Sequence, residues 1–448
     1  MSHDLDALTS QLLDAARAAG ADEADALARA ATALSVDVRG GALEQAERSE
    51  SVEIGLRVLV GRRVATVSGS DLRPESMATM AERAVAMARV APEDPHAGLA
   101  DAVQLAQGWD IAALDLVDPD PAPDPAALED AARRAEAAAR AVSGVSQIDS
   151  AAAGWSSARM HLAATNGFSG GYARTSHGLH CVAIAGEGTG MERDSDFDSR
   201  THGADLSAPE EIGRRAAERA VERLSPRRPR TGAYPVLFDE RVAASLVGHL
   251  LSAANGAAIA RGASWLRDRL GDQVLPDTLS LTEDPHRPRG PASRPFDGEG
   301  LATRPRAIVA EGRLAELTLD LAAARKLGLA PTGNASRQPG GGPAPVNWNV
   351  ALTQGARSRD ALLAEMGTGL LVTSMIGATI NPNTGDYSRG AAGFWVEGGV
   401  PVYPVSGVTL AGSLPDMLRR IVPANDARPW LSRAVPSLLV EGLTLAGD

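Results

Sequence analysis

Apolar residues recur with helical spacing in several segments of the chain. Leu5, Leu8 and Leu12 share one face of a helix predicted over residues 4–19. Other segments combine this spacing with start signals, such as Asp124-Pro125 and Ser207-x-x-Glu210. These patterns predict further helices from Pro74 to the turn before Pro92, over 125–142, after Ser207 to about Leu224, and over 240–259, 359–366 and 413–420.

Other segments alternate apolar and polar residues with a period of two, which is typical of strands. The turn residues Gly61-Arg62 predict a hairpin between two of these strands. Strands are predicted over 32–39, 52–69, 146–152, 155–165 and 175–187, and short strands with Gly/Pro turns dominate from residue 274 onward.

The segment 225–232, Ser-Pro-Arg-Arg-Pro-Arg-Thr-Gly, has nothing to bury and predicts a linker. We therefore expect two domains in an α+β fold. Residues 1–230 would form an N-terminal α/β domain of mixed strands and helices. Residues 231–448 would form a β-rich domain with one long helix.

Composition narrows the functional classes. The net charge of −12 disfavours binding to nucleic acid, because phosphates would be repelled. Cys181 is the only cysteine, so an internal disulfide or a multi-thiolate zinc site is excluded. An acidic start without an apolar core is unlike a signal peptide, and no run approaches membrane-helix length. These features predict a cytoplasmic protein without a membrane span.

Candidate catalytic groups are sparse. His177-x-x-His180 is followed by Cys181, but side chains three positions apart on a strand face opposite ways, which disfavours a shared metal. The Gly167–Gly171 segment matches a nucleophile elbow around Ser169, yet a strand rather than a helix is predicted after it. A hairpin turn is therefore the better interpretation, and no catalytic or metal-binding residue is assigned.

Two further sets of polar residues leave alternatives open. Asp284, Asp297 and Glu299 lie in a proline-rich segment, where a solvated loop is a better interpretation than a cation site. His249 falls on the apolar face of its predicted helix, and it is either a core histidine or a contact for substrate or partner.

Residues 385–403 place aromatic side chains beside glycines, a pattern that suits close approach of another chain. The segment predicts contact with substrate or with a partner subunit. The candidate contact residues are His249, Asp386, Tyr387, Arg389, Phe394, Trp395 and Tyr403.

Several motifs together resemble the TldD/PmbA family, also called modulator of DNA gyrase. The most specific is Gly385-Asp-Tyr-Ser-Arg-Gly-Ala-Ala-Gly-Phe-Trp-Val-Glu397. The others are Pro235–Phe238 with Gly248-His-Leu250, Pro295–Gly300, Arg325–Leu329 with Thr332-Gly333, Met366–Gly369, Tyr403–Val405, Leu410–Ser413, and Leu43–Ser49 with Gly55–Val58.

The resemblance implies a choice between two branches. TldD-like chains carry a His-Glu-x-x-x-His helix and a late Cys that hold zinc, with the Glu as general base. In this chain the corresponding positions are Gly248, His249 and Ala253, and no Cys follows Cys181. The chain thus resembles the PmbA-like branch, also called TldE. No cofactor is expected in it, and zinc is expected in a TldD-like partner.

The resemblance implies that this chain is a non-catalytic subunit of a heterodimeric metalloprotease that cleaves unfolded peptides. Such peptides could bind as an added strand. Two alternatives stay open: a self-sufficient metallopeptidase with His177, His180 or His249 as unusual ligands, or a stand-alone homodimer that binds peptides.

Overall fold

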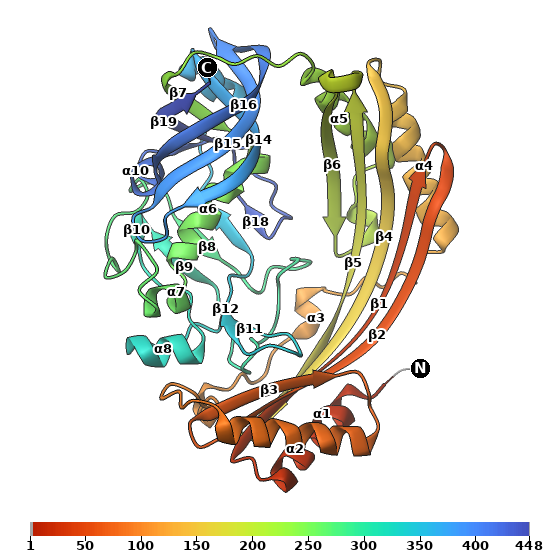
Figure 1. The fold of residues 1–448 in the computed structure, drawn as a ribbon, viewed down its shortest axis with the longest axis vertical. Coiled ribbons are helices and arrows are strands. Elements are labelled where there is room, and N and C mark those ends of the chain that lie inside the picture. The colour runs from red at the N-terminus through yellow and green to blue at the C-terminus, as the bar shows by residue number, and fades with distance from the viewer. Residues whose placement is uncertain (1–2, 448) are drawn as a thin grey trace.

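The computed structural model describes residues 3–447, except for the side chains of residues 378 and 379. A long curved sheet from the N-terminal half forms one side of the molecule, and the C-terminal half lies against its concave face (Figure 1). The α+β fold class predicted from the sequence is confirmed. The division at residues 230 and 231 stays a prediction, although β7 begins just after it at Gly232.

The N-terminal sheet is antiparallel throughout, in the order β3-β2-β1-β4-β5-β6. Its strands are longer than the alternation predicts, because ladder pairing extends through alanine-rich segments that have no clear period of their own. The hairpin turn at Gly61-Arg62 is present. The strands are β1 (Glu23–Arg39), β2 (Ala42–Val60), β3 (Arg63–Gly69), β4 (Val145–Ala164), β5 (Ser169–Ala185) and β6 (Glu192–Arg200).

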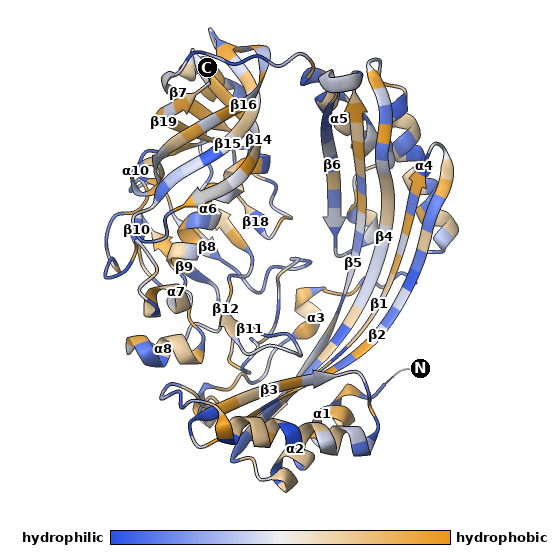
Figure 2. Ribbon diagram, in the orientation of Figure 1, coloured by the Kyte–Doolittle hydropathy of each residue, from blue (hydrophilic) through white to orange (hydrophobic). Residues whose placement is uncertain are grey.

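Helices cover only the convex face of this sheet. Ala26 contacts the layer of α1 (Leu5–Ala19) and α2 (Pro74–Val90), and Val36 contacts the layer of α4 (Pro125–Arg140) and α5 (Pro209–Glu222). Leu27, the neighbour of Ala26, belongs instead to a cluster on the opposite face that includes Phe296 from the C-terminal half. Since side chains alternate along a strand, one face packs on helices and the other on the second half of the chain (Figure 2).

Two predicted helix boundaries are wrong. Ser207 does not cap α5, since its hydroxyl and amide bond Asp198 Oδ2, each at 3.0 Å, and the helix begins at Pro209. The helix predicted over 240–259 is split, because the Asn255 side chain accepts hydrogen bonds from Ala257 and Ala258 and starts a new helix. In each case a polar side chain near a helix end forms hydrogen bonds that the sequence pattern does not predict.

The C-terminal half is built around a curled sheet in the order β16-β15-β14-β7-β19-β17, in which β16 also pairs with β19. A five-stranded sheet, β10-β9-β8-β13-β18, and the pair β11-β12 lie beside it. The strands are β7 (Gly232–Phe238), β8 (Leu281–Glu283), β9 (Arg306–Ala310), β10 (Arg313–Leu314), β11 (Ala335–Ser336), β12 (Ala344–Pro345), β13 (Val350–Leu352), β14 (Gly369–Ile380), β15 (Asp386–Glu397), β16 (Val400–Ser413), β17 (Val422–Pro423), β18 (Arg433–Ala434) and β19 (Leu438–Ala446).

The helix α6 (Glu240–Ala253) is the longest of the C-terminal half and packs on the curled sheet. Leu246 and Leu250 are fully buried in the same cluster as Val372 of β14. The remaining helices are short: α3 (Ile111–Leu114), α7 (Gly256–Ala260), α8 (Leu321–Leu327), α9 (Arg359–Met366) and α10 (Leu414–Leu418). No helix among residues 3–447 is long and apolar enough to cross a membrane.

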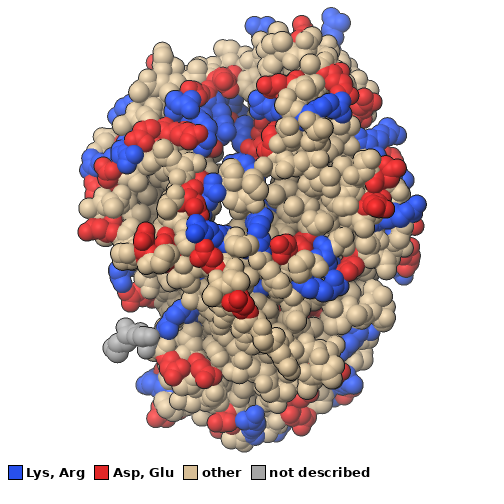
Figure 3. Space-filling view, turned by 180° about the vertical axis from the view of Figure 1, so that it is seen from behind, with Lys and Arg blue, Asp and Glu red and all other residues tan. Residues whose placement is uncertain are grey.

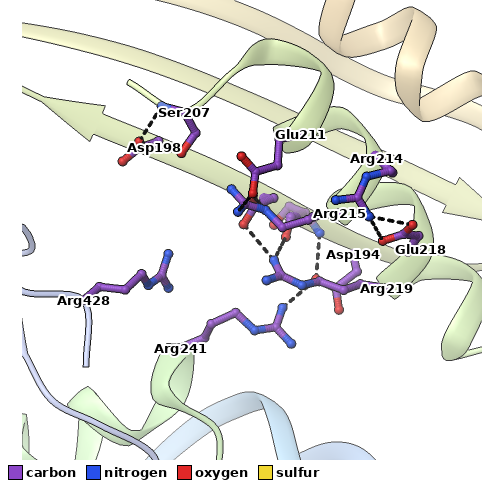
Figure 4. A network of polar contacts seen from close by, with 12 residues as sticks. Asp194, Asp198, Ser207, Glu211, Arg214, Arg215, Glu218, Arg219, Arg241 and Arg428 are labelled. Carbon is purple, nitrogen blue, oxygen red and sulfur yellow. Dashed lines mark hydrogen bonds and ion pairs between the residues drawn. The ribbon is translucent and has the colours of Figure 1, made fainter. Parts of the chain in front are cut away.

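Charged contacts hold the two halves together at the edge of the long sheet. Arg241 Nη1 of α6 lies 3.1 Å from Asp194 Oδ1 on β6 (Figure 4). Elsewhere, Arg325 of α8 donates to the carbonyl oxygen of Leu99 at 2.6 Å. These bonds connect elements that are far apart in the sequence.

A buried ionic cluster joins the two halves. Arg57 Nε of β2 donates to Asp25 Oδ2 of β1 at 2.7 Å, and Arg337 from the C-terminal half forms an ion pair with the same carboxylate. The side chains of all three are at least nine-tenths buried. The loop at Pro339 approaches Gly55 so closely that a Cβ there would lie 2.1 Å from the Pro339 carbonyl oxygen.

We predict that Asp25→Ala lowers the free energy of unfolding by about 3–5 kcal/mol, because it leaves two buried guanidinium groups without their carboxylate. Chemical denaturation monitored by circular dichroism measures this change. Asp14→Ala, on the exposed surface of α1, should change stability by about 0.5 kcal/mol or less. Equal stabilities of the two variants would contradict a structural role for the cluster.

Trp395, one of the predicted contact residues, lies inside the folded chain. The Trp395 side chain is only 7% exposed and packs edge-to-face on Tyr234, with ring centroids 4.9 Å apart. It also stacks on Tyr403 at 6.5 Å. The alternation of β15 turns Trp395 toward the core below α6, so its ring is unavailable at the surface of the single chain.

We predict that Trp395→Ala destabilises the fold by about 3–5 kcal/mol through the cavity that it leaves. Thermal or chemical unfolding of the isolated chain measures the loss. Val402→Ala serves as the control, because Val402 is 54% exposed on the neighbouring strand β16. An unchanged stability of the Trp395 variant would show that this ring does not contribute to the core.

Candidate functional site

The candidate site lies along the solvent-facing stripe of α6. Asp239 caps the helix by accepting a hydrogen bond from Arg241 N at 3.2 Å, which fixes where the helix begins. The helix buries Leu246 and Leu250 but leaves Ser245 and His249 only half-buried. Residues four apart lie on one helical face, so Ser245 and His249 point the same way.

Three side chains from distant strands surround His249. The ring of Tyr387 lies edge-on to the imidazole, with centroids 6.1 Å apart. Arg389 reaches the helix at Ser245, with 3.4 Å between its Nη1 and the serine Oγ. Arg433 approaches the backbone beside His249, because a Cβ on Gly248 would lie 3.1 Å from its Nη1.

The surroundings of His249 keep its imidazole neutral. Burial, together with the smaller effect of the positive charges of Arg389 and Arg433, lowers its pKa to about 4. Its Nε2 is buried and has no hydrogen-bond partner among the described residues. A neutral imidazole beside two guanidinium groups can accept a hydrogen bond, but it is poorly matched to general base catalysis near pH 7.

The three positions that the family resemblance matches to a zinc-binding helix are Gly248, His249 and Ala253. Gly248 has no side chain, Ala253 is buried and apolar, and His249 is flanked by cations. Within residues 3–447 there is no group of three or more His, Cys, Asp or Glu side chains that could hold a metal ion.

The other proposed histidine ligands do not converge. His177 Nε2 lies 2.9 Å from Asp118 Oδ2, while His180 is exposed and lies 3.5 Å from Ser150 Oγ. Cys181 is fully buried, and burial raises the pKa of its thiol to about 12. Ser169 follows a hairpin turn between β4 and β5, as the sequence predicts, and is not part of a strand-to-helix elbow.

The predicted contact residues of β15 and β16 occupy different environments. Tyr387 is 2% exposed, and its hydroxyl donates a hydrogen bond to the sulfur of Met375. It therefore packs beneath the site as a buried residue and is not available for contact at the surface. Phe394 packs on the opposite face of β15, against the cluster around Leu237. Asp386 is exposed at the start of the strand, while Arg389 and Tyr403 are half-buried.

Sequence reasoning brought Tyr387, Arg389 and His249 into one set, and the structure places them together. It missed Arg433 and Ser245, because no local pattern links a residue of β18 to α6. It was wrong about the acidic loop: Asp297 is 2% and Glu299 8% exposed. The Asp297 carboxylate tolerates burial because it accepts hydrogen bonds from the amides of Glu299, Leu301 and Ala335.

Comparison with known proteins identifies the family. Three models of PmbA/TldA metallopeptidase domains match the chain: domain 1 over residues 24–88, the central domain over 118–224 and the C-terminal domain over 231–447. The fold and the three matches define a protein built like a metallopeptidase of this type. The chain belongs to the PmbA/TldA family, which is the TldD/PmbA family that its motifs resemble.

Curated relatives cover nearly the whole chain. It is 39% identical over 428 residues to Metalloprotease PmbA of Escherichia coli O157:H7, covering 95% of this chain and 93% of that protein. It is 34% identical over 418 residues to a Metalloprotease PmbA homolog of Haemophilus influenzae, covering 93% and 90%.

Solved structures show the same architecture. A putative modulator of DNA gyrase from Bacteroides thetaiotaomicron superimposes with a TM-score of 0.91 at 26% identity, covering 99% of this chain and 98% of that one. TldE from Thermococcus kodakarensis superimposes with a TM-score of 0.85 at 20% identity, covering 98% and 99%. The latter likeness shows a shared fold alone.

We predict a pH effect on stability that depends on His249. His249 takes up a proton near pH 6.5 in the unfolded chain, but only near pH 4 in the folded chain. The stability that neutral His249 contributes is therefore present above pH 6.5 and lost as the pH falls from 6.5 to 4. Melting temperatures measured across this range should fall more steeply for the native chain than for His249→Gln.

Arg389→Gln provides a matched variant for the same measurement. It removes one of the two positive charges that lower the His249 pKa. The melting temperature of Arg389→Gln should therefore fall less steeply with pH than that of the native chain, and so lie closer to the behaviour of His249→Gln. Parallel melting curves for the native chain and His249→Gln at every pH would contradict the burial and charge environment described for this imidazole.

Proposed function

We propose that this chain is the non-catalytic, TldE-like subunit of a cytoplasmic zinc metalloprotease of the TldD–TldE type, which cleaves unfolded peptides. The proposal rests on the residues that α6 has at three positions and on the absence of a late cysteine. The positions that would be His, Glu and His in the catalytic branch are Gly248, His249 and Ala253, and no cysteine follows Cys181. In this proposal the zinc and its general base belong to a TldD-like partner.

The chemistry around α6 supports a binding role for this surface. His249 presents a neutral imidazole that can accept a hydrogen bond, and Arg389 and Arg433 attract negatively charged groups. These groups would contact the bound peptide or the partner subunit. Asp386 and Tyr403 would contribute at the edge of the same surface, whereas Tyr387, Phe394 and Trp395 would hold β15 in position from within the chain.

Two rival functions make different predictions for the purified chain. A self-sufficient metallopeptidase would need ligands such as His177, His180 or His249, which contact unrelated residues in this structure. A stand-alone homodimer that binds peptides would show no affinity for a TldD-like chain. The names of the relatives in Escherichia coli and Haemophilus influenzae describe metalloproteases, which fits membership in a protease complex.

We predict that the isolated chain contains far less than one zinc ion per molecule and has no peptidase activity. After co-expression with a TldD-like chain, the two should co-purify, and the complex should contain zinc and cleave an unfolded peptide. Elemental analysis, size-exclusion chromatography and a peptidase assay measure these properties. The TldD-like chain alone is the control for metal content.

Stoichiometric zinc in the isolated chain, together with chelator-sensitive peptidase activity, would favour the self-sufficient enzyme. A stable homodimer that ignores the TldD-like chain would favour the stand-alone binding protein. Either result would overturn the proposed subunit role.

A further inference from the structure

A cavity of about 250 Å³ lies between the concave face of the long sheet and loops of the C-terminal half. Its sheet side consists of concave-face residues such as Leu27, Leu162 and Arg174. Its other side is formed by residues 294–298 and 336–339. It is lined by residues remote from α6 in the sequence. Its volume suits one small group rather than a large ligand.

Two of the arginines that line this cavity, Arg174 and Arg294, form no ion pair with a carboxylate among the described residues. Arg174 donates to the backbone carbonyls of Pro291 and Ser293, and Arg294 lies 3.5 Å above the Trp348 ring. The two guanidinium groups are close enough for Arg294 to lower the pKa of Arg174, after the larger effect of burial.

Arg337 adds a third cation at the inner wall. Its side chain is 1% exposed, and Asp25, its carboxylate partner, is shared with Arg57. The Nε and Nη2 groups of Arg337 are buried without a hydrogen-bond partner among the described residues, and so is Nε of Arg174. Buried donors without a partner are costly, so these groups favour an acceptor bound in the cavity.

The one acidic residue that lines the cavity, Asp297, already accepts three hydrogen bonds from the backbone. Asp297 accepts hydrogen bonds from the backbone amides of Glu299, Leu301 and Ala335 at 2.9–3.0 Å. Burial raises its pKa to about 6, so its charge is weakened further in mildly acidic solution. The cavity therefore keeps an excess of positive charge.

A larger cavity of about 650 Å³ shares Arg174 as part of its wall. It lies between β5, β6 and residues 287–291, with Trp430 at one side. Seen from behind, the molecule is hollowed near its middle, and basic side chains gather there together with some acidic ones (Figure 3). The wider space could hold an extended chain that leads to the smaller cavity.

We propose that the small cavity binds the carboxylate of a peptide, with Arg174, Arg294 and Arg337 as its donors and the apolar wall around Leu27, Leu162 and Phe296 beside the last side chain. Guanidinium groups bind carboxylates through paired, charge-assisted hydrogen bonds. This inference rests on the proposed function, since it concerns how an unfolded peptide is held. It names the C-terminal carboxylate as the recognised group.

The test uses the isolated chain and an N-terminally labelled peptide of eight apolar and small residues, with either a free C-terminal carboxylate or a C-terminal amide. Fluorescence anisotropy measures the two dissociation constants. We expect the free carboxylate to bind at least about tenfold more tightly than the amide, as expected for losing a charge-assisted contact. Equal affinities would overturn the proposal.

Arg294→Gln should weaken binding of the free-carboxylate peptide by about tenfold and leave binding of the amide unchanged, while Arg294→Lys should recover part of the loss. Unchanged amide binding and melting temperature show that the variant is folded. Arg304→Gln is the matched control, since Arg304 pairs with Glu316 on the surface, and it should change neither affinity. An Arg294→Gln variant that still prefers the free carboxylate as strongly would overturn the assignment.

Inorganic phosphate and acetate serve as competitors that separate the possible anions. Acetate should displace the free-carboxylate peptide, and phosphate should be no better a competitor. Displacement by phosphate alone would overturn the carboxylate assignment. Because the measurement needs no partner subunit, failure to assemble with a TldD-like chain and failure to bind the carboxylate are separate outcomes.

Discussion

The buried carboxylate of Asp25 is the constraint on which the arrangement of the two halves depends. Arg57 from β2 and Arg337 from the C-terminal half both pair with it, and Arg57 lies 4.0 Å from Glu299. In water such pairs contribute little, but buried charges must find partners with good geometry. The cluster therefore fixes the position of the loops at 297–299 and 337–339 on the concave face of the sheet.

The same constraint shapes both regions of interest. By anchoring the loops at residues 294–298 and 336–339, the cluster creates the small arginine-lined cavity against β1, β4 and β5. Burial raises the pKa of Glu299 to about 8, although the positive charge of Arg57 opposes the rise, and it raises that of Asp297 to about 6. The α6 surface is anchored separately, through Arg241 and Asp194 at the edge of β6. Each of the two regions, both of which carry guanidinium groups, thus has its own contact that ties it to the long sheet.

The limits of sequence reasoning are clear at particular residues. Helical spacing located α1, α2, α4 and α6, because a repeated apolar face is a local property. It failed where the choice of hydrogen-bond partner is not local. Ser207 bonds Asp198 instead of capping α5, and Asn255 divides the helix predicted over 240–259. The interpretation of Asp297 as a solvated loop residue failed for the same reason, since the three amides that accompany its burial include one from β11.

The sequence by itself determined the α+β class, the likeness to the TldD/PmbA family, and the absence of His-Glu-His and of a late cysteine at the expected positions. These are statements about residue identity and local periodicity, which need no coordinates. Only the tertiary structure decided that Trp395 and Tyr387 lie inside the chain, that Arg433 joins Arg389 beside His249, and that five arginines line one cavity. Each of these depends on contacts between strands far apart in the chain, and a linear pattern carries no record of which distant residues share a face.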